Sequence, residues 1–191
     1  MAKSKLGEKG ISLLYEKDSL KVRHLRKKDD ILLARWLSDP FVLEFYEGRD
    51  KPFDVQKVHQ KLYNRNKDLV GCIVTYKGLD IGYIQYYHVN KKTSKIDSDD
   101  GTENVYGIDQ FIGETAYWNK GIGTLLIKSM VAFLFEQKHA DKVIMDPQVQ
   151  NERAIKCYEK CGFKKVRMLP HHELHEGEYR DCWLMEYRKP I

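Results

Sequence analysis

The sequence predicts an α+β (α/β) fold in which a mixed, mostly antiparallel sheet of six to seven strands is covered by about four helices. Two β-like segments, Leu69–Tyr76 and Ile81–Val89, flank a turn at Lys77–Asp80 and predict an antiparallel hairpin. Farther on, Val105–Ile112 is followed by a glycine-containing turn, a helical pattern and another strand, which predicts a crossover and therefore one parallel pair. With 191 residues and 42% hydrophobic side chains, the chain has the size and apolar content of one domain.

The first part of the chain alternates a strand with capped helices. Residues 1–20 are expected to be an extension with a short strand at Ile11–Tyr15, and the domain is expected over residues 21–191. Asp residues stand where the helices should begin, and their side chains are suitable N-caps. The elements expected before the hairpin are a strand at Lys21–Leu25 and helices at about Asp29–Leu37 and Val55–Arg65.

The second part is predicted from apolar stripes and glycines. A wide apolar stripe predicts a helix from Gly121 to about Gln137, and Asn151 can cap another helix that ends at Gly162. The polar stretches 90–104 and 170–180 are expected to be loops. The remaining expected strands are Lys142–Met145, Lys164–Met168 and Asp181–Tyr187.

Composition narrows the class of protein. No apolar run reaches the roughly 20 residues that a membrane helix needs, and we expect a cytoplasmic protein. The net charge of +5 suits an anionic small ligand, whereas the interleaved basic and aromatic residues typical of nucleic-acid binding are missing. The four cysteines contain no CxxC pair and are expected to be buried or half-buried thiols.

The stretch Gly107–Thr124 organises the predicted chemistry. Gly121 and Gly123 lie where a strand turns into a helix, and glycines there let backbone N–H groups at the helix N-terminus approach a phosphate. Asp109 lies in the middle of the preceding strand, where a carboxylate is uncommon and costly to bury. A phosphate cradle beside a strand acid indicates an enzyme that holds a phosphorylated donor next to proton or charge chemistry.

Two motifs resemble those of the GNAT family of N-acetyltransferases. Residues Trp118–Gly123 resemble the family's turn, Arg/Gln-x-x-Gly-x-Gly/Ala, with Trp118 in place of the usual Arg or Gln. Residues Asn151–Phe163 resemble the pattern Asn-x-x-Ala-x-x-x-Tyr-x-x-x-Gly-Phe. The resemblance implies the GNAT fold, in which two parallel strands splay apart, and it implies acetyl-CoA as cosubstrate with no metal.

Further segments are similar to the aminoglycoside 6′-N-acetyltransferases of that family. They are Val42–Asp50, Tyr106–Glu114, Asp146–Pro147 and His172–Gly177. The similarity implies direct transfer of acetyl to the 6′-amine of an aminoglycoside, with no covalent enzyme intermediate and with antibiotic resistance as the outcome. We also expect a monomer or homodimer, and from the composition a protein that binds neither nucleic acid nor membrane.

The resemblance assigns a role to individual residues. Asp109 is implied to take the proton of the amine, and Tyr158 to protonate the departing thiolate. The implied coenzyme-binding residues are Gln110, Phe111, Ile112, Trp118, Asn119, Lys120, Gly121, Ile122, Gly123, Thr124, Asn151, Ala154 and Tyr158. The implied acceptor-binding residues are Phe45, Tyr46, Glu47, Asp109, Glu114, Asp146, Glu173 and Glu176.

Alternatives stand beside these assignments. Asp109 could only bind the cationic sugar, Asp146 could form an Asx turn, and Asn151 could only cap its helix. The histidines of the C-terminal loop lack the usual spacing of a metal site and are expected to line the acceptor site: His171, His172 and His175. Two competing functions are acetylation of another amine (a polyamine, a siderophore precursor or a protein N-terminus) and non-catalytic binding of coenzyme A or an antibiotic.

Overall fold

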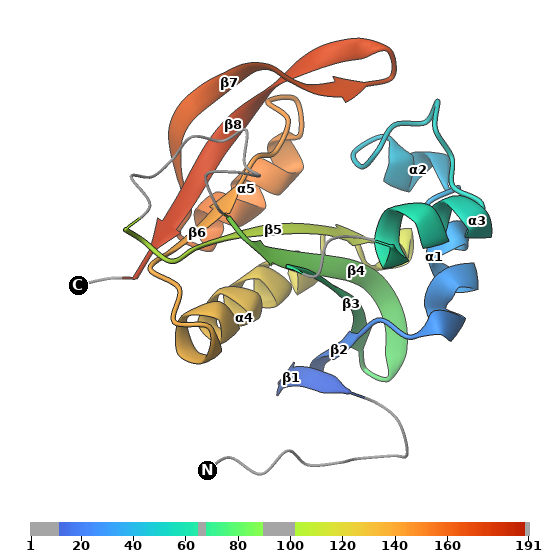
Figure 1. The fold of residues 1–191 in the computed structure, drawn as a ribbon, viewed down its shortest axis with the longest axis horizontal. Helices are drawn as coiled ribbons and strands as arrows, with labels where there is room; N and C mark the ends of the chain where they lie inside the picture. The colour runs from blue at the N-terminus through green and yellow to red at the C-terminus, as the bar shows by residue number, and fades with distance from the viewer. Residues whose placement is uncertain (1–11, 65–67, 90–101, 190–191) are drawn as a thin grey trace.

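The computed structural model of the chain describes residues 12–64, 68–89 and 102–189. Residues 1–11 of the predicted extension and 90–101 of the predicted loop lie outside this description. Eight strands form one sheet in the order β1-β2-β3-β4-β5-β6-β8-β7, and every neighbouring pair is antiparallel except β5 and β6 (Figure 1). The strands are β1 Leu13–Lys17, β2 Leu20–His24, β3 Leu69–Tyr76, β4 Leu79–His88, β5 Val105–Ile112, β6 Lys142–Met145, β7 Lys164–His175 and β8 Glu178–Arg188.

This mixed, mostly antiparallel sheet with one parallel pair confirms the predicted fold class. It has one strand more than the predicted six to seven. The eighth strand is β1, which pairs with β2. It was expected inside the extension, outside the six to seven strands of the domain, but it belongs to the same sheet. The strand expected at Ile11–Tyr15 is thus observed at Leu13–Lys17.

Helices cover both faces of the sheet. Side chains alternate between the faces along a strand. Val74 therefore packs with the buried side chains of α4, whereas Ile73 and Tyr83 pack with those of α1 to α3. Figure 1 shows α4 on one side of the sheet and α1 to α3 on the other. The helices are α1 Asp30–Trp36, α2 Pro40–Leu43, α3 Val55–Val58, α4 Ile122–Gln137 and α5 Glu152–Lys160, with short helical turns at Lys27–Asp29, His59–Tyr63 and Thr115–Tyr117. Within the described part of the chain, none of the helices combines the length and the apolar character that crossing a membrane requires.

Local side chains explain where the helices begin and which face they bury. The Asp39 and Asp54 carboxylates accept backbone N–H bonds at the starts of α2 and α3, and Asn151 accepts one from Ala154 at the start of α5. In α4, Leu126, Met130 and Leu134 recur every four residues and are fully buried.

The C-terminal loop predicted at residues 170–180 is wrong, because most of it is strand. β7 continues to His175 and β8 starts at Glu178, so only a two-residue turn separates them. Glu176 and Gly177 have φ angles of 52° and 81°, the left-handed pair that a tight hairpin turn requires. Figure 1 shows the resulting long hairpin reaching across the molecule toward α2.

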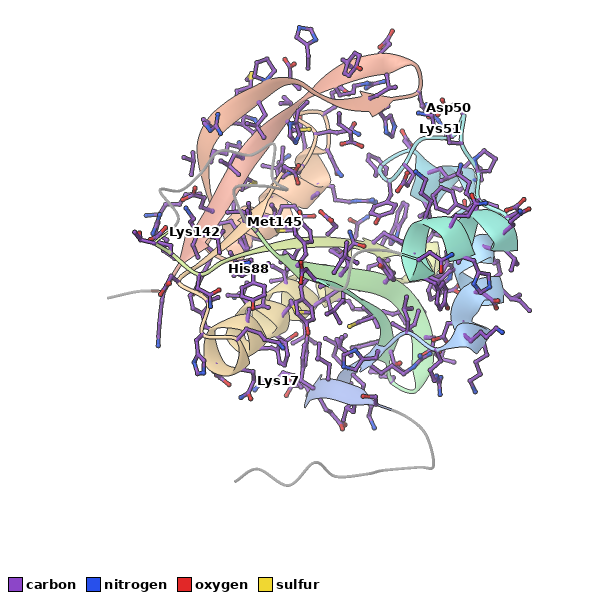
Figure 2. The ribbon with its side chains drawn as sticks, viewed as in Figure 1. Lys17, Asp50, Lys51, His88, Lys142 and Met145 are labelled. Carbon is purple, nitrogen blue, oxygen red and sulfur yellow. The ribbon has the colours of Figure 1, made fainter. Side chains whose placement is uncertain are left out.

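The parallel pair opens after three residues. β5 pairs with β6 only from Val105 to Gly107, although β5 continues to Ile112 with its other edge bonded to β4. The backbone edge of β5 that faces β6 is therefore unpaired with β6 from Ile108 onward. Below this opening, the ammonium of Lys142, which is 1% exposed, lies 3.2 Å from Glu103 and 3.7 Å from Glu186. Figure 2 shows Lys142 and Met145 at the two ends of β6.

Candidate active site

Two adjoining cavities lie where β5 and β6 separate. The first, the donor cavity, has a volume of about 440 Å³ and lies between the end of β5, the turn into α4, and α5. The second, the acceptor cavity, has a volume of about 690 Å³ and lies between β5, β6, the loop after α2, and β7. The residues that line both cavities define their junction: Phe45, Tyr46, Gln110, Asn151 and Tyr158.

The turn into α4 is shaped for an anion. Gly121 has a φ of 77°, and a Cβ placed on it would meet no protein atom within 4 Å. The first N–H groups of α4 have no partner within their own helix, so they point with the positive end of the helix dipole toward this space. A phosphate group of a ligand is suited to this position.

Most predicted coenzyme-binding residues line the donor cavity. Lys120 and Ile122 do not: the Lys120 ammonium lies 5.7 Å from the centre of the Tyr117 ring, and Ile122 is buried in the core. Their N–H groups belong to the turn, so any contact they make with a ligand there would be through the backbone. The predicted residues that line the cavity are Gln110, Phe111, Ile112, Trp118, Asn119, Gly121, Gly123, Thr124, Asn151, Ala154 and Tyr158.

Unsatisfied polar groups in the donor cavity suit an extended ligand with amide groups. The Gln110 side chain donates to the Tyr158 hydroxyl at 3.3 Å, but its buried Oε1 has no hydrogen-bond partner within the described part of the chain. The open edge of β5 also presents backbone groups beside the cavity. A pantetheine arm carries amides that can pair with both, in the manner of a strand added to a sheet edge.

Asp109 faces the acceptor cavity from β5, and its orientation is held from β4. Gln85 lies directly opposite it in the antiparallel register, and the Gln85 amide donates to Asp109 Oδ2 at 2.6 Å. The Tyr83 hydroxyl in turn donates to Gln85 Oε1 at 2.8 Å. Gln85 was not predicted from the sequence, because the long stretch between β4 and β5 leaves the register of these two strands unspecified.

Three further carboxylates line the acceptor cavity beside Asp109: Glu47, Asp146 and Glu173. Three lysines, Lys51, Lys57 and Lys61, line it as well, and the Lys57 ammonium is bonded to the Lys51 carbonyl at 2.8 Å. Asp146 Oδ2 lies 2.8 Å from His172 Nε2. Burial, with repulsion from Asp146 and Glu47, raises the pKa of Glu173. Burial and repulsion from Asp109 and Asp146 likewise raise the pKa of Tyr87. Carboxylates that repel one another in a partly buried cavity favour a cationic ligand.

Two predicted acceptor residues do not reach the cavity. Glu114 accepts a hydrogen bond from Trp36 Nε1 at 2.8 Å and is paired with Arg35, so its carboxylate joins α1 to the end of β5. Glu176, at the hairpin tip, accepts bonds from the backbone N–H and the guanidinium of Arg49 at 3.0 and 2.8 Å. Both carboxylates join distant segments around the site, and neither lines the acceptor cavity.

Tyr158 and Asn151 lie at the junction. Burial raises the pKa of the Tyr158 phenol, so the hydroxyl keeps its proton at neutral pH and can donate it in a hydrogen bond. Asn151 Oδ1 accepts from the Ala154 N–H at 3.2 Å, which is the capping role, and the same residue also lines both cavities. Among the described residues, no group of three or more His, Cys, Asp or Glu side chains could hold a metal ion.

Four residues of α5 were missed by the sequence reasoning and line the donor cavity: Arg153, Lys156, Cys157 and Lys160. Arg153 and Cys157 have interactions that bear on the site. The Arg153 guanidinium stacks on Trp118, with its carbon 3.9 Å from the ring centre. A hydrogen bond with Cys161, reinforced by one with Thr124, lowers the pKa of Cys157 to about 6. Their signal in the sequence was spacing: both fall on the helical face that follows Asn151.

This arrangement defines a group-transfer enzyme, in which a phosphate-bearing donor meets a cationic acceptor at one junction. Comparison of the sequence with known families identifies the class of enzyme. The acetyltransferase (GNAT) domain matches residues 26–170, about three quarters of the chain, and the protein belongs to that family, as its motifs predicted. It is therefore an acetyltransferase of the GNAT type.

Individual relatives agree with this assignment. The aminoglycoside N(6′)-acetyltransferase type 1 of Klebsiella pneumoniae is 30% identical over 151 residues, which are 78% of this chain and 75% of that protein. The crystal structure of aminoglycoside acetyltransferase AAC(6′)-Ib with coenzyme A is 27% identical, with a TM-score of 0.72 over 90% of this chain and 95% of that one. The structure of AAC(6′)-Ib with coenzyme A and kanamycin superposes with a TM-score of 0.71 over the same fractions.

Proposed function

We propose that the protein transfers the acetyl group of acetyl-CoA to the 6′-amine of an aminoglycoside. The main support is the junction, where a donor cavity with a phosphate-binding turn meets a cavity lined by four carboxylates. Relatives named for this reaction share the chain's sequence and fold. An aminoglycoside carries several ammonium groups, and these can pair with the four carboxylates, which outnumber the three lysines of the same lining.

The residues at the junction account for direct transfer. Acetyl-CoA supplies a thioester whose carbonyl carbon is attacked by the amine. Asp109, held by Gln85, accepts the proton that the ammonium must lose before the neutral amine can attack, directly or through a water. Tyr158 donates a hydrogen bond and then a proton to the departing thiolate. Asn151 and Gln110 hold the pantetheine amides.

The acceptor is bound by charge at several points. Asp146, Glu173 and Glu47 take the ammonium groups that do not react, while Phe45 and Tyr46 pack against the sugar rings. Acetylation removes one positive charge from the antibiotic, and we propose that resistance is the consequence. We propose that the enzyme acts as a monomer or as a homodimer. Four free thiols suit the reducing cytoplasm, where we place the enzyme.

A panel of acceptors tests this proposal. Aminoglycosides with a 6′-amine, matched analogues with a 6′-hydroxyl, a polyamine and a peptide N-terminus are each incubated with acetyl-CoA, and free thiol is followed. We expect turnover with the 6′-amines and none with the 6′-hydroxyl analogues. If only the polyamine or only the peptide is acetylated, the acceptor is that amine and not an aminoglycoside. If no amine leads to thiol release, the protein is not an acetyltransferase for these acceptors.

A further inference from the structure

The N–H groups of the turn into α4 account for only part of the charge that the donor brings. Acetyl-CoA carries three phosphate groups, two in the pyrophosphate and one on the 3′-oxygen of the ribose. A helix N-terminus provides a few N–H groups in one place, which suits the pyrophosphate. In the family motif an Arg or Gln precedes this turn, and here the position is Trp118. Cations for the remaining charge must therefore come from elsewhere.

A cationic face of α5, consisting of Arg153, Lys156 and Lys160, supplies them. Residues three and four apart share one side of a helix, and all three line the donor cavity. Lys156 pairs with the exposed Glu152 at 3.1 Å. In the described part of the chain, no carboxylate lies within 4.0 Å of the cationic nitrogens of Arg153 or Lys160.

Arg153 lies against Trp118, the residue that stands where the family motif has an Arg or Gln. Its guanidinium carbon lies 3.9 Å from the centre of the Trp118 ring and 4.8 Å from that of Phe45. The Trp118 indole is itself held by a hydrogen bond to the Ile112 carbonyl at 2.8 Å. Burial lowers the pKa of Arg153, and this effect exceeds the opposing attraction of Glu44, so the cation loses more hydration than this carboxylate compensates.

Lys160 lies where the donor cavity continues outward. A groove of about 1000 Å³ lies between α4, α5 and the end of β8. Among the described residues, Lys160 is the one that lines both this groove and the donor cavity. Five cations line this groove against the two carboxylates Glu136 and Glu159: Lys128, Lys160, Lys164, Arg188 and Lys189. Of these, Arg188 is already paired with Glu103 and Glu186. The groove offers room and positive charge for the adenosine end of the donor.

We propose that the cationic face of α5 binds donor phosphates, Arg153 at the pyrophosphate and Lys156 with Lys160 at the 3′-phosphate. The enzyme therefore distinguishes acetyl-CoA from acetyl-dephospho-CoA, which lacks only the 3′-phosphate. This inference rests on the proposed function, since it names the part of the donor that these side chains recognise.

The test compares the two donors with one accepted amine, following thiol release. For the unaltered enzyme we expect the KM of acetyl-dephospho-CoA to be about tenfold higher, with kcat within about twofold, because charge-assisted phosphate contacts bind donor and transition state alike. The double variant Lys156→Ala/Lys160→Ala should raise the KM of acetyl-CoA about tenfold and leave that of acetyl-dephospho-CoA unchanged. Arg153→Ala should raise both KM values by the same factor.

Lys17→Ala is the matched control, because it removes one exposed cation far from the cavity, at the lower edge of the molecule in Figure 2. It should change neither KM. Equal KM values for the two donors, or a double variant that weakens both equally, would overturn the inference. Calorimetric titration of coenzyme A and dephospho-CoA gives the same comparison without turnover. Absence of thiol release with every amine would reject the proposed function instead, and the titration would still decide the role of α5.

Discussion

Replacing Asp109 by Asn tests whether this carboxylate acts as the general base or only binds the acceptor. The substitution keeps the shape of the side chain, and the Asn carbonyl can still accept the 2.6 Å bond from the Gln85 amide, so the acceptor cavity keeps its form. What is lost is the negative charge and the ability to take a proton. A positioned general base contributes roughly 10²- to 10⁴-fold, which corresponds to about 3 to 5 kcal/mol of transition-state stabilisation. We expect kcat to fall by that factor.

Asp146→Asn is the matched control, because it removes the same charge from the same cavity. Asp146 is half-buried and binds a non-reacting ammonium in our account, so its loss should cost about 1 kcal/mol and raise the acceptor KM roughly fivefold with little change in kcat. Steady-state kinetics with one 6′-amino acceptor measures both variants. If Asp109→Asn changes KM only, as Asp146→Asn should, Asp109 binds the acceptor and is not the base.

Three other predictions concern the thiolate, the thiols and the buried lysine. Tyr158→Phe should lower kcat roughly 10- to 100-fold with an unchanged KM for acetyl-CoA, and an unchanged kcat would remove Tyr158 from the reaction. Because the pKa of Cys157 is lowered to about 6, its alkylation by iodoacetamide should be fast at pH 7, slow at pH 5 and blocked by coenzyme A. Alkylation that coenzyme A does not slow would place Cys157 outside the donor path. Lys142→Ala removes the buried ammonium between Glu103 and Glu186 and leaves both carboxylates paired with Arg188. This loss should destabilise the fold by about 2 kcal/mol and lower Tm by roughly 6 °C in calorimetry. A Tm within about 1 °C of the unaltered protein would show that the Lys142 pairs contribute little.

Elements with a local signature were predicted well. The apolar stripe of α4, the Asn151 cap and the β3–β4 hairpin each depend on side chains within a few positions of one another, and all three are observed. The C-terminal hairpin was mistaken for a loop because its residues are polar. β7 is the edge strand of the sheet, where one face is solvated, so a run such as His171–His175 gives no apolar alternation.

For the candidate site, the sequence indicated the residues of contiguous motifs but not the contacts between residues far apart in the chain. Gly121 and Tyr158 belong to patterns that are contiguous in the sequence. The Glu114 carboxylate is held by Arg35 and Trp36, which lie almost 80 residues earlier and contact it only in the folded chain. The stacking of Arg153 on Trp118 likewise joins α5 to the turn before α4. Such contacts follow from the tertiary arrangement, which no local pattern specifies.

The central claim is that one acetyl group passes from acetyl-CoA to one particular amine of the acceptor. Its most direct test is the structure of the product formed from kanamycin and acetyl-CoA, determined by NMR together with the amount of thiol released. The account predicts a single product acetylated at the 6′-nitrogen, with one thiol per product. Acetylation at another nitrogen, a mixture of positions, or thiol release without an acetylated product would contradict it.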